Sequence, residues 1–379
     1  MKIGIDCRKF YDAHANVGAG IERFTYHLVR TLLRSDEKND YVLFFYNDIT
    51  PETIHKARGK NVRVRVRKIV RRSSKIPLYD SHIEFSRFLK KENLDLTIFP
   101  ANVIPLFYGG RSILIVHDLA IYKYPEWFPE RQWLSTKVLV PKSLKKAEKI
   151  IAISQSTKND LMKLFEVPEE KITVIYPGIK VKSSYLPEEI DRVKEKYNIA
   201  GDYLLYIGTI EPRKNILKLM RAFSNYLFEN DNTKVNLVLA GAKGWKFQPI
   251  IQLMSDINKR LGENKIKYIG KVSDRERNIL IKNCRAFVFP SQYEGFGFPV
   301  LEAMTLGVPV LTGDNSSLRE IAGDAALLVD ANDLNDIRRG IQKISEDEDF
   351  RNRLAEKGTA QAGKFSWEKT AEEFLAIIK

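Results

Sequence analysis

The chain has 379 residues, of which 44% are hydrophobic, and a formal net charge of +14 at pH 7. This length exceeds one ordinary domain, so we expect two hydrophobic cores and two domains. Cys7 and Cys284 are the two cysteines, and neither belongs to a C-x-x-C pair or a zinc-type cluster, which argues against a disulfide framework and indicates a reduced, cytoplasmic compartment. The chain reaches Asp6 before any apolar signal core, and nowhere do about 18 apolar residues run together, so we expect neither export nor a membrane span.

The positive charge predicts an anionic partner, which is nucleic acid, phospholipid headgroups or a phosphorylated substrate. The densest basic run extends from Lys56 to Lys75 without an acidic residue, and valine alternates with arginine over residues 62–67. That alternation predicts a strand with one apolar and one cationic face. The run is either a solvated strand and loop or a patch that holds the protein on the inner face of an anionic membrane. No zinc-finger, RNA-recognition or helix-turn-helix signature accompanies it, so nucleic acid is the least favoured partner.

Short β-rich apolar runs alternate with longer segments of helical period, and this happens twice along the chain. The alternation is typical of βαβ units around parallel sheets and predicts two Rossmann-like α/β domains. The strands expected in the first domain are 2–6, 41–46, 62–66, 96–100, 112–117, 149–153 and 172–176. Those expected in the second domain are 203–210, 235–241, 266–270, 286–290, 308–312 and 326–329. Helices are expected between the strands, notably at 21–33 and 154–165.

Turn-forming residues from Pro177-Gly178 to Pro187 predict the hinge between the two domains. A last helix follows Ser366, which is a suitable N-cap, and we expect this helix to pack back on the N-terminal domain. The predicted organisation is therefore an N-terminal domain, a C-terminal domain and a closing helix, over residues 1–180, 181–365 and 366–379.

In the first predicted domain, a loop with Gly18 and Gly20 follows the first strand and opens a helix, which lets the backbone approach an anionic ligand. The loop resembles the dinucleotide fingerprint G-x-G-x-x-G, but Arg23 stands where the third glycine belongs, so a dehydrogenase is disfavoured. His117 closes the strand 112–117 at its carboxyl end, the edge where open α/β sheets bind ligands. Taken alone, a histidine in this position is more often structural than catalytic.

The segment Gly208-Thr209-Ile210-Glu211-Pro212-Arg213-Lys214-Asn215 follows the first strand of the second domain and opens a helix. Gly208 permits close approach of a ligand. Arg213 offers a planar fork and Lys214 a point charge, a pairing suited to a diphosphate whose charge grows on bond cleavage. The alternative is a solvated first turn, but cations at a helix N-terminus oppose the helix dipole, and this cost favours an anionic partner.

The most informative segment spans residues 289–304, where a buried strand ends at Pro290, a glycine loop follows and a helix begins near Pro299. In this loop Gly295 and Gly297, with Phe296 and Phe298, bring backbone N–H groups and a helix N-terminus toward a phosphate. Glu294 in the loop would reach the hydroxyls of a neutral sugar, and Glu302 inside the helix would accept hydrogen bonds from a ribose diol. The alternative is that Glu302 only complements the helix dipole and that the glycines only form a turn.

Taken together, these motifs resemble retaining glycosyltransferases of the GT-B fold, specifically glycosyltransferase family 4, over nearly the whole chain. The most specific match is the pair Glu294 and Glu302, with seven residues between them that include Gly-Phe-Gly-Phe-Pro. Residues 208–215 and 116–119 match the family as well. The resemblance implies two Rossmann-like domains that face each other across a cleft, with the acceptor on the N-terminal side and the nucleotide sugar on the C-terminal side.

The resemblance also implies a role for each motif. Arg213 and Lys214 would bind the donor diphosphate, Glu294 the donor sugar and Glu302 the ribose. His117 would lie beside the donor sugar, the loop around Gly18 and Gly20 would close over the phosphates, and Lys271-Val272 would contact the base. The implied catalytic residues are His117, Glu294, Arg213 and Lys214. The implied donor-binding residues are Gly18, Gly20, Gly208, Arg213, Lys214, Val272, Gly295, Phe296, Gly297, Phe298 and Glu302.

We therefore expect transfer of a hexose, with retention of configuration, to a saccharide or lipid-linked saccharide, without a metal or other cofactor. GDP-mannose is the favoured donor, because residues 208–215 and the region of His117 with Pro125-Glu126-Trp127-Phe128-Pro129 resemble the mannosyltransferase branch; UDP-glucose, UDP-N-acetylglucosamine and UDP-galactose stay open. The best Asp-x-Asp match, residues 347–349, lies between helical segments, so it predicts no metal site. Two other classes remain as alternatives: a sugar-nucleotide 2-epimerase and a non-catalytic nucleotide-sugar-binding protein.

Overall fold

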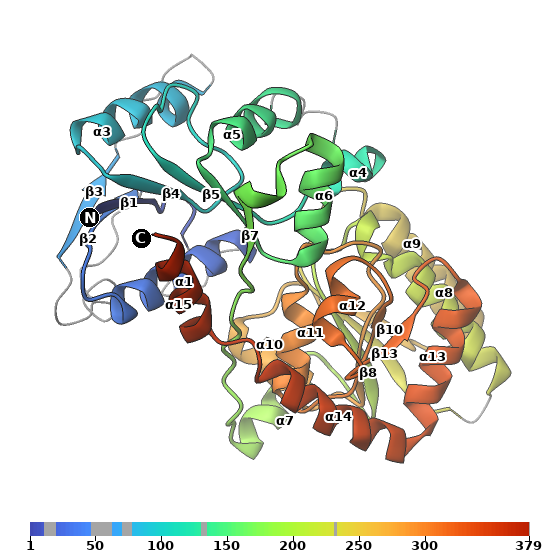
Figure 1. The fold of residues 1–379 in the computed structure, drawn as a ribbon. Coiled ribbons are helices and arrows are strands. Elements are labelled where there is room, and N and C mark those ends of the chain that lie inside the picture. Colours follow the sequence, from blue (N-terminus) through green and yellow to red (C-terminus); the bar gives the residue numbers. More distant parts are fainter. Residues whose placement is uncertain (11–19, 47–62, 70–77, 130–134, 231–232, 379) are drawn as a thin grey trace. The chain divides into compact units, whose positions relative to one another are not determined.

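A computed structural model describes residues 1–10, 20–46, 63–69, 78–129, 135–230 and 233–378 (Figure 1). Contacts divide the chain into two compact units. Unit 1 comprises residues 1–123, 130–178 and 365–379, and unit 2 comprises residues 124–129 and 179–364. The chain therefore enters unit 2 twice, first with the short segment 124–129 and then with most of its second half.

Unit 1 is built on a seven-stranded parallel sheet with the order β3-β2-β1-β4-β5-β6-β7. Its strands are β1 (Lys2–Asp6), β2 (Asp40–Phe45), β3 (Val64–Lys68), β4 (Leu96–Phe99), β5 (Ser112–Val116), β6 (Lys149–Ala152) and β7 (Ile172–Val174). The central strands β4 and β5 are buried along their whole length. Strands of a parallel sheet that is covered on both faces read as continuous apolar runs, which is why these segments stand out in the sequence.

The helices of unit 1, except the last, connect these strands. They are α1 (Gly20–Ser35), α3 (Phe85–Lys91), α4 (Ala120–Lys123), α5 (Val140–Lys146), α6 (Gln155–Phe165) and α15 (Trp367–Ile377), with shorter helical turns η1 (Tyr79–Glu84), η4 (Ser135–Leu139) and η5 (Glu169–Lys171). The last helix, α15, lies beside α1, more than 300 residues earlier in the sequence (Figure 1). Trp367 stacks on His27 with ring centroids 5.2 Å apart, and the side chain of Ser366 caps the helix by accepting from the backbone N–H of Lys369.

Unit 2 has a six-stranded parallel sheet with the order β10-β9-β8-β11-β12-β13. Its strands are β8 (Tyr203–Ile207), β9 (Asn236–Ala240), β10 (Ile266–Tyr268), β11 (Ala286–Phe289), β12 (Val310–Gly313) and β13 (Leu327–Val329). Its helices are α7 (Pro187–Lys196), α8 (Ile216–Glu229), α9 (Gln248–Leu261), α10 (Asp274–Lys282), α11 (Phe298–Thr305), α12 (Ser316–Ala322), α13 (Leu334–Glu346) and α14 (Glu348–Ala362), with 3-10 turns η2 (Pro125–Trp127) and η6 (Pro212–Lys214).

The two parallel sheets confirm the predicted fold class, since each expected strand has a counterpart in the described residues. The strand near residue 64 does not bury its valines as a face: Val66 is 43% exposed, as is the side chain of Arg67, which pairs with Glu92. The reason is that β3 lies at the edge of its sheet. Of the basic run, residues 56–62 and 70–75 lie outside the described residues. Within the described part of the chain, no helix is long and apolar enough to cross a bilayer.

Candidate active site

The two cations predicted to bind a diphosphate belong to an ion cluster at the carboxyl edge of the sheet in unit 2. Arg213 and Lys214 lie in η6, between β8 and α8. Lys214 Nζ donates to Glu294 Oε1 at 2.5 Å, and Arg213 Nη1 donates to Glu294 Oε2 at 3.3 Å. Arg213 Nε donates to Glu211 Oε1 at 2.5 Å. Lys214 is 7% exposed, so the alternative of a solvated turn does not hold for this residue.

The charges of this cluster balance, because Glu211 and Glu294 face Arg213 and Lys214. Burial lowers the pKa of Lys214, and the neighbouring Arg213 acts in the same direction. Burial alone would raise the pKa of Glu294, but Lys214 and Arg213 outweigh it, so that the pKa of Glu294 lies below its ordinary value. Glu294 is therefore an ionised acceptor inside the protein, and a diphosphate bound here would share Arg213 and Lys214 with carboxylates already in place.

The loop that carries Glu294 is held by three serine side chains. Ser291 Oγ donates to Glu294 Oε1 at 2.7 Å. Ser317 Oγ donates to the backbone carbonyls of Glu294 and Phe296, at 2.9 Å in each case. The backbone N–H of Glu294 donates to Ser316 Oγ at 3.0 Å. The carboxylate is thus placed by contacts to the loop after β11, to α12 and to η6 together, which is the preorganisation that a binding or catalytic group requires.

Two of the predicted glycines lie where the structure leaves little room for a side chain. Gly297, just before α11, has a φ of 103°, a conformation that other residues rarely adopt, and an added Cβ would lie 2.9 Å from Leu318. At Gly208 an added Cβ would lie 2.6 Å from the hydroxyl oxygen of Tyr206, and a Cβ on Gly241 would lie 1.9 Å from the carbonyl oxygen of Gly208. Protein backbone thus lies close to Gly208 on the side of Gly241.

The remaining residues of the glycine loop are mostly buried. Gly295 and Phe296 are buried, Phe298 is partly exposed, and the rings of Phe296 and Phe298 lie 5.0 Å apart edge to face. Val272, expected near the base, is half-buried in the short link between β10 and α10.

Glu302 lies in α11 and is 8% exposed. Its Oε1 pairs with Nη2 of Arg277, from α10, at 3.0 Å. In the part of the chain that the structure describes, no donor other than this guanidinium contacts the carboxylate, so most lone pairs of Glu302 stay open to a ligand. No sequence motif pointed to Arg277.

In unit 1, His117 follows β5 at the carboxyl edge of the sheet. Its Nε2 lies 2.6 Å from the carbonyl oxygen of Pro100. A carbonyl only accepts hydrogen bonds, so Nε2 carries the proton. Burial lowers the pKa of His117 despite the opposing effect of this hydrogen bond. The imidazole is therefore neutral at pH 7, with Nδ1 as its acceptor nitrogen, and the ring of Phe24 packs against it edge to face at 4.8 Å.

The loop expected to close over the phosphates lies largely outside the described residues, and Gly18 is among those not described. Gly20 is the exposed first residue of α1, and an added Cβ there would meet nothing within 4 Å.

The segment 124–129 contributes aromatic rings to unit 2 that no motif had placed there. Tyr124 stacks on Trp127 with centroids 4.0 Å apart, and it meets Tyr293 edge to face at 5.9 Å. Phe128 packs on Trp245 at 5.6 Å, and the indole N–H of Trp245 donates to the carbonyl oxygen of Trp127. Because Tyr293 precedes Glu294, this segment borders the ion cluster.

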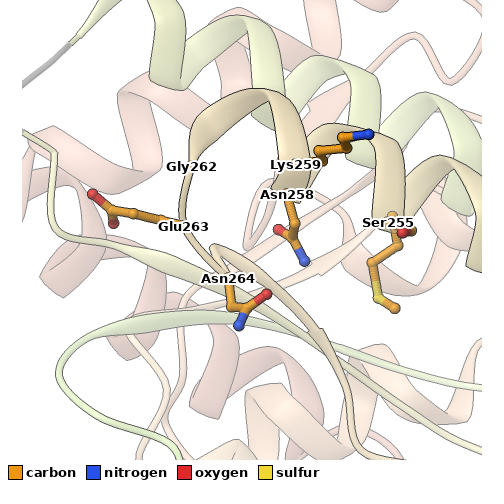
Figure 2. Close-up of a pocket in the computed structure, with 7 residues that line it drawn as sticks. Ser255, Asn258, Lys259, Gly262, Glu263 and Asn264 are labelled. Atoms are coloured by element: carbon orange, nitrogen blue, oxygen red, sulfur yellow. The ribbon is translucent and has the colours of Figure 1, made fainter.

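Three further observations concern metal and ligand binding. Among the residues that the structure describes, no cluster of three or more His, Cys, Asp and Glu side chains could hold a metal ion. Asp347, from the Asp-x-Asp match, is exposed and caps α14 by accepting from the backbone N–H of Phe350 at 2.8 Å, as a helix junction would. Figure 2 shows a pocket at the C-terminal end of α9, lined by Met254, Ser255, Asn258, Lys259, Gly262, Glu263 and Asn264, and none of these is a predicted site residue.

Comparison with known proteins identifies relatives of both halves of the chain. Residues 18–183 match the family model Glycosyltransferase Family 4, and residues 188–361 match the model Glycosyl transferases group 1. The chain is 35% identical over 273 residues to O-antigen chain mannosyltransferase B of Escherichia coli, covering 71% of this chain and 70% of that protein. It is 33% identical over 290 residues to the serotype-specific mannosyltransferase WbdA of Escherichia coli, covering 73% of this chain but 34% of that protein. The chain thus spans about a third of WbdA.

A solved structure shows the same fold over the full length. HepE of Anabaena, solved in complex with UDP and glucose, superposes with a TM-score of 0.74 at 18% sequence identity, covering 100% of this chain and 98% of that one. These matches confirm the family that the sequence motifs resemble. The chain belongs to the family 4, group 1 glycosyltransferases of the GT-B fold, and it is a hexosyltransferase.

Proposed function

We propose that the protein transfers mannose from GDP-mannose to a saccharide or lipid-linked saccharide, with retention of the anomeric configuration. Mannosyltransferases among its relatives support the choice of sugar. The observation that carries the proposal is the cluster of Arg213, Lys214 and Glu294, which places two cations and an ionised carboxylate at the carboxyl edge of one parallel sheet. Open α/β sheets bind their ligands at this edge.

In this proposal Arg213 and Lys214 bind the donor diphosphate. As the bond between the sugar carbon and the phosphate oxygen breaks, negative charge grows on the diphosphate, and cations held in place beforehand stabilise it with little reorganisation. The acceptor oxygen forms the new bond on the face that the nucleotide leaves, and its proton passes to the departing phosphate oxygen. The enzyme then supplies no nucleophile, and the configuration of the sugar is kept.

The remaining predicted residues bind the two ends of the donor. Glu294 accepts hydrogen bonds from the hexose, since its carboxylate is ionised and already fixed by Lys214 and Ser291. Glu302 accepts from the ribose hydroxyls. His117 is neutral, so its Nδ1 accepts from a sugar hydroxyl rather than stabilising a phosphate.

The loops complete the proposed donor site. Residues 295–298 present backbone N–H groups to the phosphates, and Val272 lies against the base. Positive charge comes from Arg213, Lys214 and the N-terminus of α11, and the proposal includes no divalent metal.

A panel of sugar nucleotides, assayed for slow hydrolysis without acceptor, tests this function. GDP-mannose should be hydrolysed faster than UDP-glucose, UDP-galactose and UDP-N-acetylglucosamine. Faster hydrolysis of a UDP-sugar would show that this sugar nucleotide, and not GDP-mannose, is the donor. Formation of a 2-epimer, or binding of nucleotide sugars without turnover, would overturn the proposed transfer.

A further inference from the structure

Arg277 holds the carboxylate that the proposed function assigns to ribose. Its Nη2 lies 3.0 Å from Glu302 Oε1, and its Nη1 lies 3.7 Å from Asp274 Oδ1, one turn earlier in α10. The two side chains of the Arg277–Glu302 pair are 17% and 11% exposed. Water screens a pair this enclosed less than it screens surface charges, so the attraction of the guanidinium helps to fix the position of the carboxylate.

The placement of Arg277 is not explained by its own hydrogen bonds. Its Nε is buried and has no hydrogen-bond partner among the described residues. A buried N–H without an acceptor is destabilising, and such groups are rare in folded proteins. The unpaired Nε–H therefore makes the position of Arg277 locally destabilising, and the ion pair with Glu302 is the interaction that accounts for it.

The ion pair with Arg277 leaves carboxylate oxygens of Glu302 available to a ligand. The carboxylate is compensated by the positive charge of Arg277, and in the described part of the chain no other donor contacts its oxygens. An ionised carboxylate has about four acceptor sites, so two neighbouring hydroxyls can bind it together. A vicinal diol is the ligand group that fits this arrangement.

We propose that Arg277 is a positioning residue for Glu302 and thereby sets the preference of the enzyme for ribonucleotide over 2′-deoxyribonucleotide donors. This inference rests on the proposed ribose-binding role of Glu302. Without the guanidinium, the carboxylate would be a buried charge with no partner, free to change rotamer, and its contact with the 2′-hydroxyl would weaken. Contacts to the phosphates and to the base would stay as they are.

The test is a calorimetric titration of GDP and 2′-deoxy-GDP into the full chain, or of UDP and 2′-deoxy-UDP if UDP binds more tightly. Wild type, Arg277→Gln, Arg277→Lys and Glu302→Gln are compared. Arg275→Gln is the matched control, because Arg275 lies on the same helix and pairs instead with Glu189, and its side chain is 53% exposed. Thermal unfolding of each variant is recorded beside the titrations.

Wild type should prefer the ribonucleotide by about tenfold, the value of one good hydrogen bond to a charged acceptor. Arg277→Gln should reduce this preference to about twofold by weakening the ribonucleotide alone, and Arg277→Lys should restore part of it, because the charge is kept. Arg275→Gln should leave it unchanged. An unchanged preference in Arg277→Gln, or equal weakening of both nucleotides, would overturn the inference.

The same titrations separate this inference from the proposed function. If Glu302→Gln kept the full preference for ribonucleotide, the assigned role of Glu302 would be wrong, whatever Arg277 does. If Glu302→Gln lost the preference and Arg277→Gln kept it, the role of Glu302 would stand and the positioning role of Arg277 would fall. Binding of neither nucleotide to wild type would overturn both.

Discussion

Lys214 and Glu294, 80 positions apart in the sequence, form a buried ion pair with Nζ and Oε1 2.5 Å apart. They meet because β8 and β11, the strands that precede them, are neighbours in one parallel sheet. Their loops therefore leave the same edge of the sheet side by side.

Lys214→Met should destabilise unit 2 by about 3 kcal/mol, because breaking a buried pair leaves one charge uncompensated. Arg213 still contacts Glu294, so the loss should fall at the lower end of the range for such pairs. Urea unfolding measures the change. The double variant Lys214→Met/Glu294→Gln should lose less than the sum of the two single losses. Additive losses would mean that the pair is not coupled.

Glu302→Gln should weaken the binding of the free nucleoside diphosphate by about tenfold, because a carboxamide accepts hydroxyl hydrogen bonds less well than a carboxylate. Glu294→Gln should leave this binding within about twofold and instead slow hydrolysis of the sugar nucleotide, since the hexose is absent from the free diphosphate. Calorimetry and a hydrolysis assay on the same preparations check the contrast. Equal losses of nucleotide affinity would contradict the division of labour between the two glutamates.

Tyr124→Ala should lower the turnover of the sugar nucleotide by about tenfold with little change in nucleotide affinity, because Tyr124 packs on Tyr293, next to Glu294. Tyr124→Phe keeps the ring and should retain most of the activity. Phe107→Ala, at a 68% exposed aromatic residue of unit 1, is the control and should behave as wild type. Wild-type turnover in Tyr124→Ala would show that the contact between Tyr124 and Tyr293 does not contribute to activity.

The stability of the protein should fall as the pH drops from about 6.5 toward 4, in part because of His82. Burial lowers the pKa of His82 to about 4, and Arg8 and Lys146 act in the same direction. An unfolded histidine titrates near pH 6.5, so between these values the unfolded state binds the extra proton and gains stability. Protonation of the folded state would also break the hydrogen bond that Nδ1 accepts from the N–H of Leu106 at 3.1 Å.

His82→Gln should therefore unfold with a smaller difference between pH 7.5 and pH 4.5 than wild type. Urea titrations at the two pH values give this difference. Parallel pH profiles for the two proteins would show that His82 does not contribute to the dependence.

Transfer should persist in excess chelator and should produce a linkage with the configuration of the donor sugar, because Arg213, Lys214 and the N-terminus of α11 supply the positive charge. Proton NMR of the product reads the configuration. Loss of activity in chelator with recovery in magnesium or manganese would refute the metal-free diphosphate site. An inverted linkage would refute retention and leave the fold unaffected.

The sequence by itself determined the fold of this protein to a large degree. Runs such as 112–116 are buried at every position and almost wholly apolar, because both faces of a parallel sheet are covered. Each such strand can therefore be recognised in the sequence. The turn before α11 can also be recognised in the sequence, since a φ of 103° at Gly297 requires glycine and Pro299 suits a helix start. These are local constraints, and each is set by a few neighbouring residues.

Only the tertiary structure decided which charges meet. The pairing of Arg277 with Glu302, and the packing of residues 124–129 in unit 2, depend on which elements become neighbours, and nothing in either segment specifies its partner. The exposed Val66 likewise follows from the place of β3 at a sheet edge. The periodicity of apolar residues indicates which face of a helix or strand is buried. Strand order and helix packing bring distant side chains within the few ångströms over which ion pairs and hydrogen bonds act.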